Sequence, residues 1–285
     1  VAASALMEGR HDSQWVEIAG TVRRVSTDRE HNDLDIVSDG HRFNATLPLS
    51  EDFDALSALT GATVRLRGAC GTIFNRRRQM IGIRIFVPRA GEIEILSPPP
   101  RDPFDAPPRS VNKLMGYAPD AVHASRVRVR AVVTLVMPDG DLFVADATGS
   151  MRVRPLRSYS LSRGDEIEAT GFAAQDTFAA SLEDAYVRPT GLHRDVVPVP
   201  LDVREAIGGA NAAAFVTLDA VLLDAGRRGE GIALALSKDG RVFSAELPAT
   251  TTPLAAWTPG SLLRVTGVCV IEADDHRRAR RFRLL

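Results

Sequence analysis

Two arginine-rich segments are the residues of this chain whose chemistry best suits a ligand. Guanidinium groups pair with phosphates and carboxylates through two parallel hydrogen bonds, which makes such clusters suited to anions. An aromatic ring beside them can stack on a base or a sugar. We therefore take these segments as the candidate ligand-binding site. The candidate residues are Phe74, Asn75, Arg76, Arg77, Arg78, Arg277, Arg278, Arg280 and Arg281.

The composition limits what these arginines bind. The chain has 35 basic and 36 acidic residues, and only 6% of its residues are aromatic. A dedicated nucleic-acid binder is usually basic and rich in stacking rings, so we do not expect nucleic acid as the partner. Solvated loops or interdomain contacts are the plain interpretation of both clusters. A small anionic ligand is the main alternative, and single-strand binding is a further one.

No known catalytic pattern occurs in the sequence. The chain has no His-Glu-x-x-His zinc motif, phosphate-binding glycine loop, Gly-x-Ser-x-Gly elbow or Cys-x-x-Cys pair. His31 lies among acidic residues and His276 follows Asp274-Asp275, but polar hairpin tips commonly have this composition. We expect no catalytic residue, no metal and no cofactor. Cys70 and Cys269 are expected to be buried free thiols.

The elements that position the arginines belong to an internal repeat. The segment Asp39–Pro48 returns as Asp239–Pro248, with Asp, Gly, Phe, Ala, Leu and Pro at the same places. Shortly downstream, Gly68 and Cys70 return as Gly267 and Cys269. A repeat of this size predicts duplicated domains rather than one large core.

A third copy becomes visible when the alternating apolar and polar residues are aligned. Its first strand is expected near 126–133, between those near 15–22 and 215–222. Each copy continues with a hairpin and two further strands, and a small residue interrupts the first strand. Five short strands of this kind predict an all-β fold: three tandem OB-like Greek-key barrels. The two arginine clusters then lie between the fourth and fifth strands, beside the usual OB ligand groove.

Short helical prefixes and proline-rich joints complete the predicted plan. Helices are expected near 4–7, 110–114 and 202–207, at the N-terminal side of each barrel. Proline-rich segments act as semi-rigid spacers between them. The predicted boundaries are 1–97 for barrel 1, 98–109 for a linker, 110–191 for barrel 2, 192–201 for a second linker, and 202–285 for barrel 3.

Several stretches resemble the extracytoplasmic sensor region of large bacterial sensor histidine kinases. The most specific one is Cys70-Gly-Thr-Ile-Phe74-Asn75, within the run that ends at Pro88. Asp102-Pro103-Phe104, 126–134, 142–149 and 260–269 add to the resemblance, which spans nearly the whole chain. The kinase's own phosphoaccepting histidine and ATP-binding motifs do not occur in this sequence.

The resemblance implies a periplasmic input region of a bacterial inner-membrane protein in two-component signal transduction, without catalysis of its own. Its signal would be an unknown small molecule, oligosaccharide or protein. It also implies a membrane anchor beyond Leu285, so a segment of about 20 apolar residues must follow there. A dimeric parent is left open. The alternatives are an OB-fold protein that binds single-stranded nucleic acid or oligosaccharide, and a structural spacer or protein-interaction module.

Overall fold

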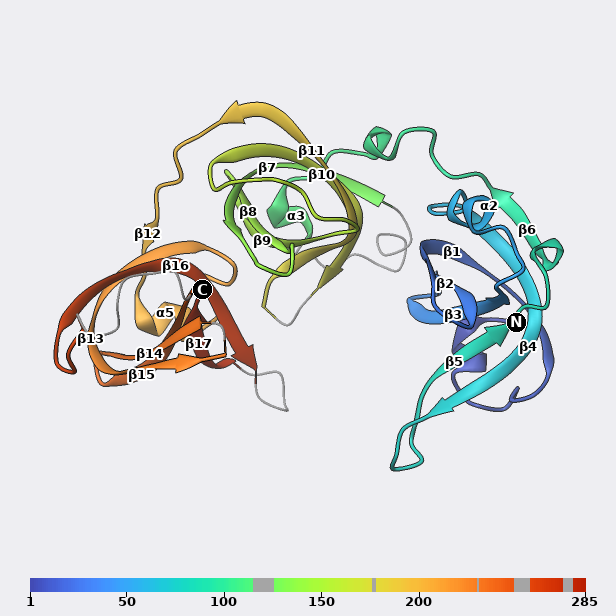
Figure 1. Ribbon diagram of the computed structural model, residues 1–285, viewed down its shortest axis with the longest axis horizontal. Coiled ribbons are helices and arrows are strands. Elements are labelled where there is room, and N and C mark those ends of the chain that lie inside the picture. Colours follow the sequence, from blue (N-terminus) through green and yellow to red (C-terminus); the bar gives the residue numbers. More distant parts are fainter. Residues whose placement is uncertain (115–125, 176–177, 230, 249–256, 274–278) are drawn as a thin grey trace. The chain divides into compact units, whose positions relative to one another are not determined.

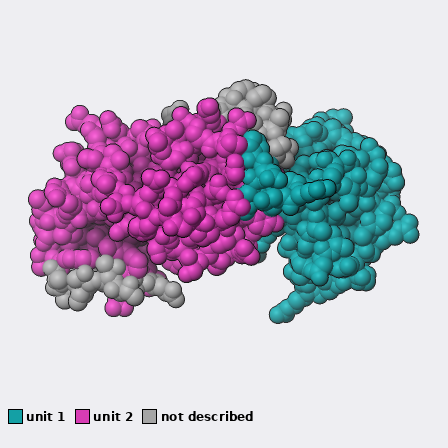
Figure 2. All heavy atoms as spheres, turned by 90° about the horizontal axis from the view of Figure 1, so that it is seen from above, with its two compact units in different colours: residues 1–107, 117–127 teal, residues 108–116, 128–285 magenta. Residues whose placement is uncertain are grey.

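The computed structural model describes residues 1–114, 126–175, 178–229, 231–248, 257–273 and 279–285, in which strands dominate. The chain forms two compact units (Figure 2). The first contains residues 1–107 and the second contains residues 128–285. The first unit holds barrel 1, and the second holds barrels 2 and 3 (Figure 1). The predicted all-β architecture of tandem OB-like barrels is confirmed.

Barrel 1 is closed by pairing of its first and fourth strands, in the order β1-β2-β3-β5-β4. One face of each strand is buried because apolar residues alternate with polar ones. The short strand β6 pairs with β4 outside the closed set. The strands are β1 (Trp15–Thr27), β2 (His31–Ser38), β3 (His41–Pro48), β4 (Thr63–Phe74), β5 (Met80–Phe86) and β6 (Ile93–Ser97).

Barrels 2 and 3 repeat this plan. Barrel 2 is a closed set of five strands in the order β10-β11-β9-β8-β7, and barrel 3 closes through the β13–β16 pairing. Barrel 2 comprises β7 (Arg126–Val136), β8 (Leu142–Asp146), β9 (Gly149–Pro155), β10 (Asp165–Gln175) and β11 (Ala180–His193). Barrel 3 comprises β13 (Phe215–Arg228), β14 (Gly231–Lys238), β15 (Arg241–Pro248), β16 (Leu262–Ala273) and β17 (Ala279–Leu284), with β12 (Val199–Pro200) beside β13.

The predicted prefix helices are present within one or two residues of their expected bounds. They are α1 (Ala3–Leu6), α3 (Val111–Leu114) and α5 (Val203–Ile207). The carboxylate of Asp202 caps α5 by accepting a hydrogen bond from the Arg204 amide. The other short helices are α2 (Phe53–Ser57), η1 (Ala90–Glu92) and η2 (Pro103–Asp105). Leu6 of α1 and Leu56 of α2 are buried in the core of barrel 1.

The repeat extends to the register of the strands. Each first strand has a β-bulge at an equivalent place, between Val22 and Arg24, between Val133 and Leu135, and between Leu222 and Asp224. A bulge sharpens the twist of a strand, which lets one strand pair with both edges of a small barrel. The sequence predicted a bend at the small residue of each first strand. The structure places the bulge two or more residues further along the strand.

Two outward-facing rows of side chains, a front row and a back row, recur in the barrels. The front row crosses the second, third and fifth strands, and the back row crosses the first, fourth and fifth strands. The front rows are Asp35, Asn44 and Arg84 in barrel 1; Phe143, Arg152 and Ser181 in barrel 2; and Ala235, Ser244 and Arg283 in barrel 3. The back rows are Trp15, Ala69 and Phe86 in barrel 1, and Phe215, Val268 and Leu285 in barrel 3.

Within the second unit, barrel 3 packs its back row on the front row of barrel 2. Phe215 and Val268 form one buried cluster with Phe143, and Leu285 lies against it. The guanidinium of Arg163 lies 5.5 Å from the centre of the Phe215 ring. The front row of barrel 2, which is the ligand side in many OB barrels, is therefore largely covered by barrel 3.

Candidate functional site

The first arginine cluster lies on the hairpin between β4 and β5, called the arginine hairpin below (74–81). It projects beyond the body of barrel 1 (Figure 1). Arg76, Arg77 and Arg78 are exposed, and their guanidinium groups have no hydrogen-bond or ion-pair partner among the described residues. Phe74 is 58% exposed and Ile81 is 64% exposed at the base of the hairpin. The hairpin thus presents three unpaired positive charges next to an accessible aromatic ring.

Asn75 holds the turn of this hairpin. Its side-chain oxygen accepts hydrogen bonds from the amides of Arg77 at 2.9 Å and Gln79 at 3.0 Å. Its Nδ2 donates to the side-chain oxygen of Gln79 at 3.0 Å. The left-handed backbone of Arg78, with φ of 58°, closes the loop. Asn75, taken from the sequence as a candidate ligand residue, is therefore engaged in positioning the arginines.

The arginines of the hairpin differ in this respect from Arg65, Arg67 and Arg89 of barrel 1, which are ion-paired. Elsewhere on this barrel, Arg65 pairs with Glu94 at 3.0 Å, and Arg67 pairs with Glu17 at 2.7 Å. Arg89 pairs with Glu92 at 2.9 Å. Arginines that already have a carboxylate partner must give it up to bind an anion, and those of the hairpin need not.

The second arginine cluster is only partly described. Arg277 and Arg278 lie outside the described residues, and Arg280 and Arg281 belong to β17. Arg281 is exposed, opposite Glu272 of β16. The first cluster belongs to barrel 1, and the described part of the second belongs to barrel 3.

The front rows contain two arginines that the sequence argument missed. Arg84 in barrel 1 and Arg283 in barrel 3 occupy the same place in the repeat, and the Nε of each is buried without a hydrogen-bond acceptor. Arg283 pairs with Glu246 at 3.0 Å through its Nη1. The recurrence of arginine 199 positions apart was a signal for this pair. In barrel 2 the equivalent residue is Ser181.

The front face of barrel 1 also carries carboxylates. Asp35 accepts hydrogen bonds from Arg42, and Asp33 accepts one from the Thr46 hydroxyl at 2.6 Å. The front face therefore carries opposite charges side by side, whereas the arginine hairpin carries positive charge alone.

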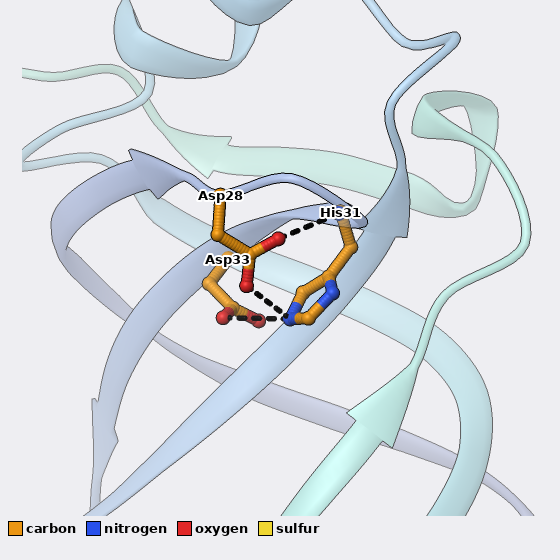
Figure 3. Close-up of side chains that lie close together, drawn as sticks. All are labelled: Asp28, His31 and Asp33. Carbon is orange, nitrogen blue, oxygen red and sulfur yellow. Dashed lines mark hydrogen bonds and ion pairs between the residues drawn. The ribbon is translucent and has the colours of Figure 1, made fainter.

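Asp28, His31 and Asp33 form a compact group at the start of β2 (Figure 3). The Nε2 of His31 lies 3.3 Å from a carboxylate oxygen of Asp28 and 3.1 Å from one of Asp33. Asp28 also accepts hydrogen bonds from the amides of Glu30 and His31, which lower the pKa of its carboxyl group. These bonds account for the turn between β1 and β2 without an ion.

Both cysteines are buried free thiols, as predicted. Burial raises the pKa of Cys70, and it raises the pKa of Cys269 to about 12. Thiols with such pKa values are protonated near neutral pH, so neither is an activated nucleophile. Across the residues that the structure describes, no helix is both long and apolar enough to span a membrane.

Two arginines on the front face of barrel 2, Arg152 and Arg154, are paired, in contrast to those of the hairpin. A cavity of about 380 Å³ between barrels 2 and 3 is lined by Phe143, Arg152 and Arg154, among others. Arg152 donates to Asp141 at 2.7 Å, and Arg154 donates to Glu183 at 2.9 Å. Both arginines of this cavity therefore already have carboxylate partners.

The comparisons with known proteins place the chain by its fold alone. No protein-family model matches it, and no curated protein does. Among solved structures it is similar to a murine DNA binding protein bound with double-stranded DNA, at 12% identity and a TM-score of 0.27, covering 65% of this chain and 99% of that one. It is also similar to a replication protein A heterotrimer bound to single-stranded DNA, at 7% identity and a TM-score of 0.27, covering 95% of this chain and 92% of that one.

One expectation is corrected by these comparisons. We did not expect nucleic acid as a partner, and that expectation is wrong: the similar structures include complexes with double-stranded and single-stranded DNA, p202 HIN1 with a 12-mer duplex among them (8% identity, TM-score 0.26, covering 63% of this chain and 93% of that one). The similarity supports tandem OB-like barrels, and it does not support a sensor histidine kinase.

Proposed function

We propose that this chain is a non-catalytic OB-fold module that binds single-stranded nucleic acid through the arginine hairpin of barrel 1. The observation that carries the proposal is the set of three exposed arginines that have no partner among the described residues and lie on a turn held by Asn75. Because the backbone of this turn is already ordered, binding has to order only the arginine side chains.

The arginines and the aromatic ring of the hairpin have different roles in this proposal. Arg76, Arg77 and Arg78 pair with backbone phosphates, which a guanidinium binds bidentately. Phe74 lies next to them in sequence and offers its exposed ring to a base, since stacking accepts any base. Single strands suit this arrangement better than duplexes because their bases are free to leave the stack.

The test compares two variants that differ from the unsubstituted chain by the same charge. Arg76→Ala/Arg77→Ala/Arg78→Ala is expected to weaken binding of a labelled oligothymidylate at least about tenfold. Its dependence on salt is expected to become shallower by about 0.7 log units for each phosphate that is no longer neutralised. Arg65→Ala/Arg67→Ala/Arg89→Ala removes three arginines that are ion-paired, and its affinity is expected to stay close to that of the unsubstituted chain. Fluorescence anisotropy over a salt series measures both.

Two results would contradict the proposal. The first is equal weakening by the two triple variants, which would indicate nonspecific attraction to net charge. The second is absence of binding by the unsubstituted chain at low salt. If an acidic oligosaccharide binds as well and Phe74→Ala leaves both affinities unchanged, the site recognises anions generally and the assignment to nucleic acid fails.

The role of an extracytoplasmic input region of a sensor kinase stays a prediction from the sequence resemblance. The contacts within the barrels have no bearing on it, and the placement in the periplasm rests on the same resemblance. An OB module that binds a polyanion is compatible with that location but does not require it.

A further inference from the structure

The turn between β1 and β2 of barrel 1 brings one imidazole and two carboxylates to a common point. The Nε2 of His31 faces the carboxylates of both Asp28 and Asp33 (Figure 3). One ligand atom from each of the three residues lies within 4.8 Å of the other two. In the part of the chain that the structure describes, no other group of three His, Cys, Asp or Glu residues comes this close together. The sequence showed only the composition of a polar hairpin tip, and the structure adds the directions of the side chains.

Each carboxylate is held by one oxygen and presents the other to His31. The Oδ1 of Asp28 accepts hydrogen bonds from the amides of Glu30 and His31, at 2.7 and 2.9 Å. The Oδ1 of Asp33 accepts a hydrogen bond from the Thr46 hydroxyl of β3 at 2.6 Å. The oxygens that face the imidazole are the two Oδ2 atoms. Surrounding groups therefore orient both carboxylates, as outer-shell hydrogen bonds orient the ligands of metal sites.

The internal repeat shows that the hairpin itself does not require these three residues. Barrel 3 forms the equivalent hairpin between β13 and β14, with the same pairing of the second strand to the third. The residues at the three equivalent places there are Arg228, Gly231 and Ala233. Barrel 1 therefore places two negative charges close together at a position where the fold needs none, although neighbouring carboxylates repel each other.

A hydrogen bond from His31 cannot satisfy both carboxylates, whereas a metal ion can. A protonated Nε2 carries a single hydrogen, and it has one oxygen at 3.1 Å and another at 3.3 Å. An ion at the common point would accept an electron pair from all three atoms. Around a tetrahedral ion with bonds of about 2.0–2.2 Å, neighbouring ligand atoms lie about 3.3–3.6 Å apart. The side chains would need to move only slightly to reach that arrangement.

We propose that Asp28, His31 and Asp33 bind a divalent transition-metal ion, with Zn²⁺ preferred over Mn²⁺ and water at the remaining positions. One nitrogen and two carboxylate oxygens suit a zinc site with three protein ligands and an open position. The same ligands bind zinc more tightly than manganese in the usual order of affinities. The side chain of Asp28 is 54% exposed, so water has access to the site. The arginine hairpin takes no part in it, so the inference goes beyond the proposed function.

A nearby positive charge limits the expected affinity. The guanidinium of Arg84 on β5 acts electrostatically on the Asp28 carboxylate, and it would repel a cation. The site also has neither a thiolate nor a second imidazole, so we expect a dissociation constant for Zn²⁺ on the order of 10 μM. Arg84→Gln is expected to tighten zinc binding about threefold, because it removes the opposing charge.

The test is isothermal titration of the chain, purified without a histidine tag, with Zn²⁺ near neutral pH. Asp33→Asn removes the charge but keeps an oxygen for the Thr46 hydroxyl, and His31→Gln removes the imidazole. Each is expected to weaken zinc binding by about tenfold or more, since loss of even an outer-shell partner can cost that much. His193→Gln is the matched control, because His193 pairs with a single carboxylate, that of Asp165, at 3.1 Å. It is expected to bind zinc like the unsubstituted chain.

The melting temperatures of the metal-free variants separate a binding defect from a folding defect. They are expected to stay close to that of the unsubstituted chain, and zinc is expected to raise only those of the unsubstituted chain and His193→Gln. A dissociation constant weaker than about 1 mM for the unsubstituted chain would overturn the proposal. So would equal weakening by His193→Gln and Asp33→Asn, or zinc binding that survives in both Asp33→Asn and His31→Gln, since the ion would then be held elsewhere. None of these readings depends on nucleic acid, so the outcome is independent of the test of the arginine hairpin.

Discussion

Glu166 is a charged residue that is almost completely buried. Its side chain is 5% exposed, on β10 of barrel 2. One oxygen accepts a hydrogen bond from Arg130 of β7, and the other accepts one at 2.6 Å from Arg194, which follows β11. The two guanidinium groups lower the pKa of the Glu166 carboxyl group from its usual value of 4.5. These ion pairs join β10 to β7 and to the segment after β11, and they exist only while the carboxylate is ionised.

The lowered pKa predicts a pH-dependent contribution to stability. Because the folded pKa is below the unfolded one, the contribution is complete above pH 4.5 and is lost as the pH falls through the folded value. Glu166→Gln is expected to lower the melting temperature by a few degrees at pH 7, with the difference from the unsubstituted chain shrinking toward pH 3. Glu30→Gln, at an exposed carboxylate, is the control. A difference that stays constant with pH would mean that the ion pairs contribute nothing.

At the scale of the elements, β4 approaches β5 very closely in barrel 1, and β16 approaches the last residue very closely in barrel 3. A Cβ atom on Gly68 would lie 2.4 Å from the carbonyl oxygen of Phe86, and one on Gly267 would lie 2.3 Å from that of Leu285. These distances are far below van der Waals contact, and the neighbour in each case is backbone, so the strands would have to separate. The glycines repeated in sequence thus mark the tightest points of the two barrels.

Gly68→Ala and Gly267→Ala are each expected to destabilise their barrel by about 1–3 kcal/mol through this overlap. Gly82→Ala on β5 is the matched control, because nothing lies within 4 Å of the added carbon. It is expected to change stability by less than about 0.5 kcal/mol. Urea unfolding measures all three. Equal effects at Gly68 and Gly82 would show that the loss of glycine, rather than the overlap, is responsible.

At the scale of the whole molecule, the repeat places the same residue position in opposite environments. Phe215 is buried between barrels 2 and 3, whereas Trp15, its equivalent, is exposed. Phe215→Ala is expected to destabilise the second unit by about 3 kcal/mol or more, as for other buried phenylalanines. It also removes the main link between barrels 2 and 3, so their unfolding transitions are expected to separate.

Trp15→Ala is the matched control for this substitution. It truncates an exposed side chain at the same position of the repeat, and its effect on the first unit is expected to be within about 0.5 kcal/mol. Differential scanning calorimetry of the two variants measures both effects. If Phe215→Ala left a single transition at an unchanged temperature, the packing of barrel 3 on barrel 2 would contribute nothing to stability.

The sequence by itself determined the class of fold and much of the local structure. Alternation of apolar and polar residues depends only on neighbours along the chain, and so do the turn at Asp39-Gly40 and the cap at Asp202. The internal repeat added the equivalence of Gly68 with Gly267, which the structure explains as two equivalent close approaches of backbone. The arginine clusters were visible for the same reason, since contiguous residues need no fold to be noticed.

Only the tertiary structure decided which of these residues are free to act. Ion pairing joins residues distant in sequence, such as Arg65 and Glu94, so the availability of Arg76, Arg77 and Arg78 could not be foreseen. The same holds for the rows, in which Trp15, Ala69 and Phe86 come from three strands. A row becomes buried or stays exposed according to what packs on it, and that depends on long-range contacts rather than on local pattern.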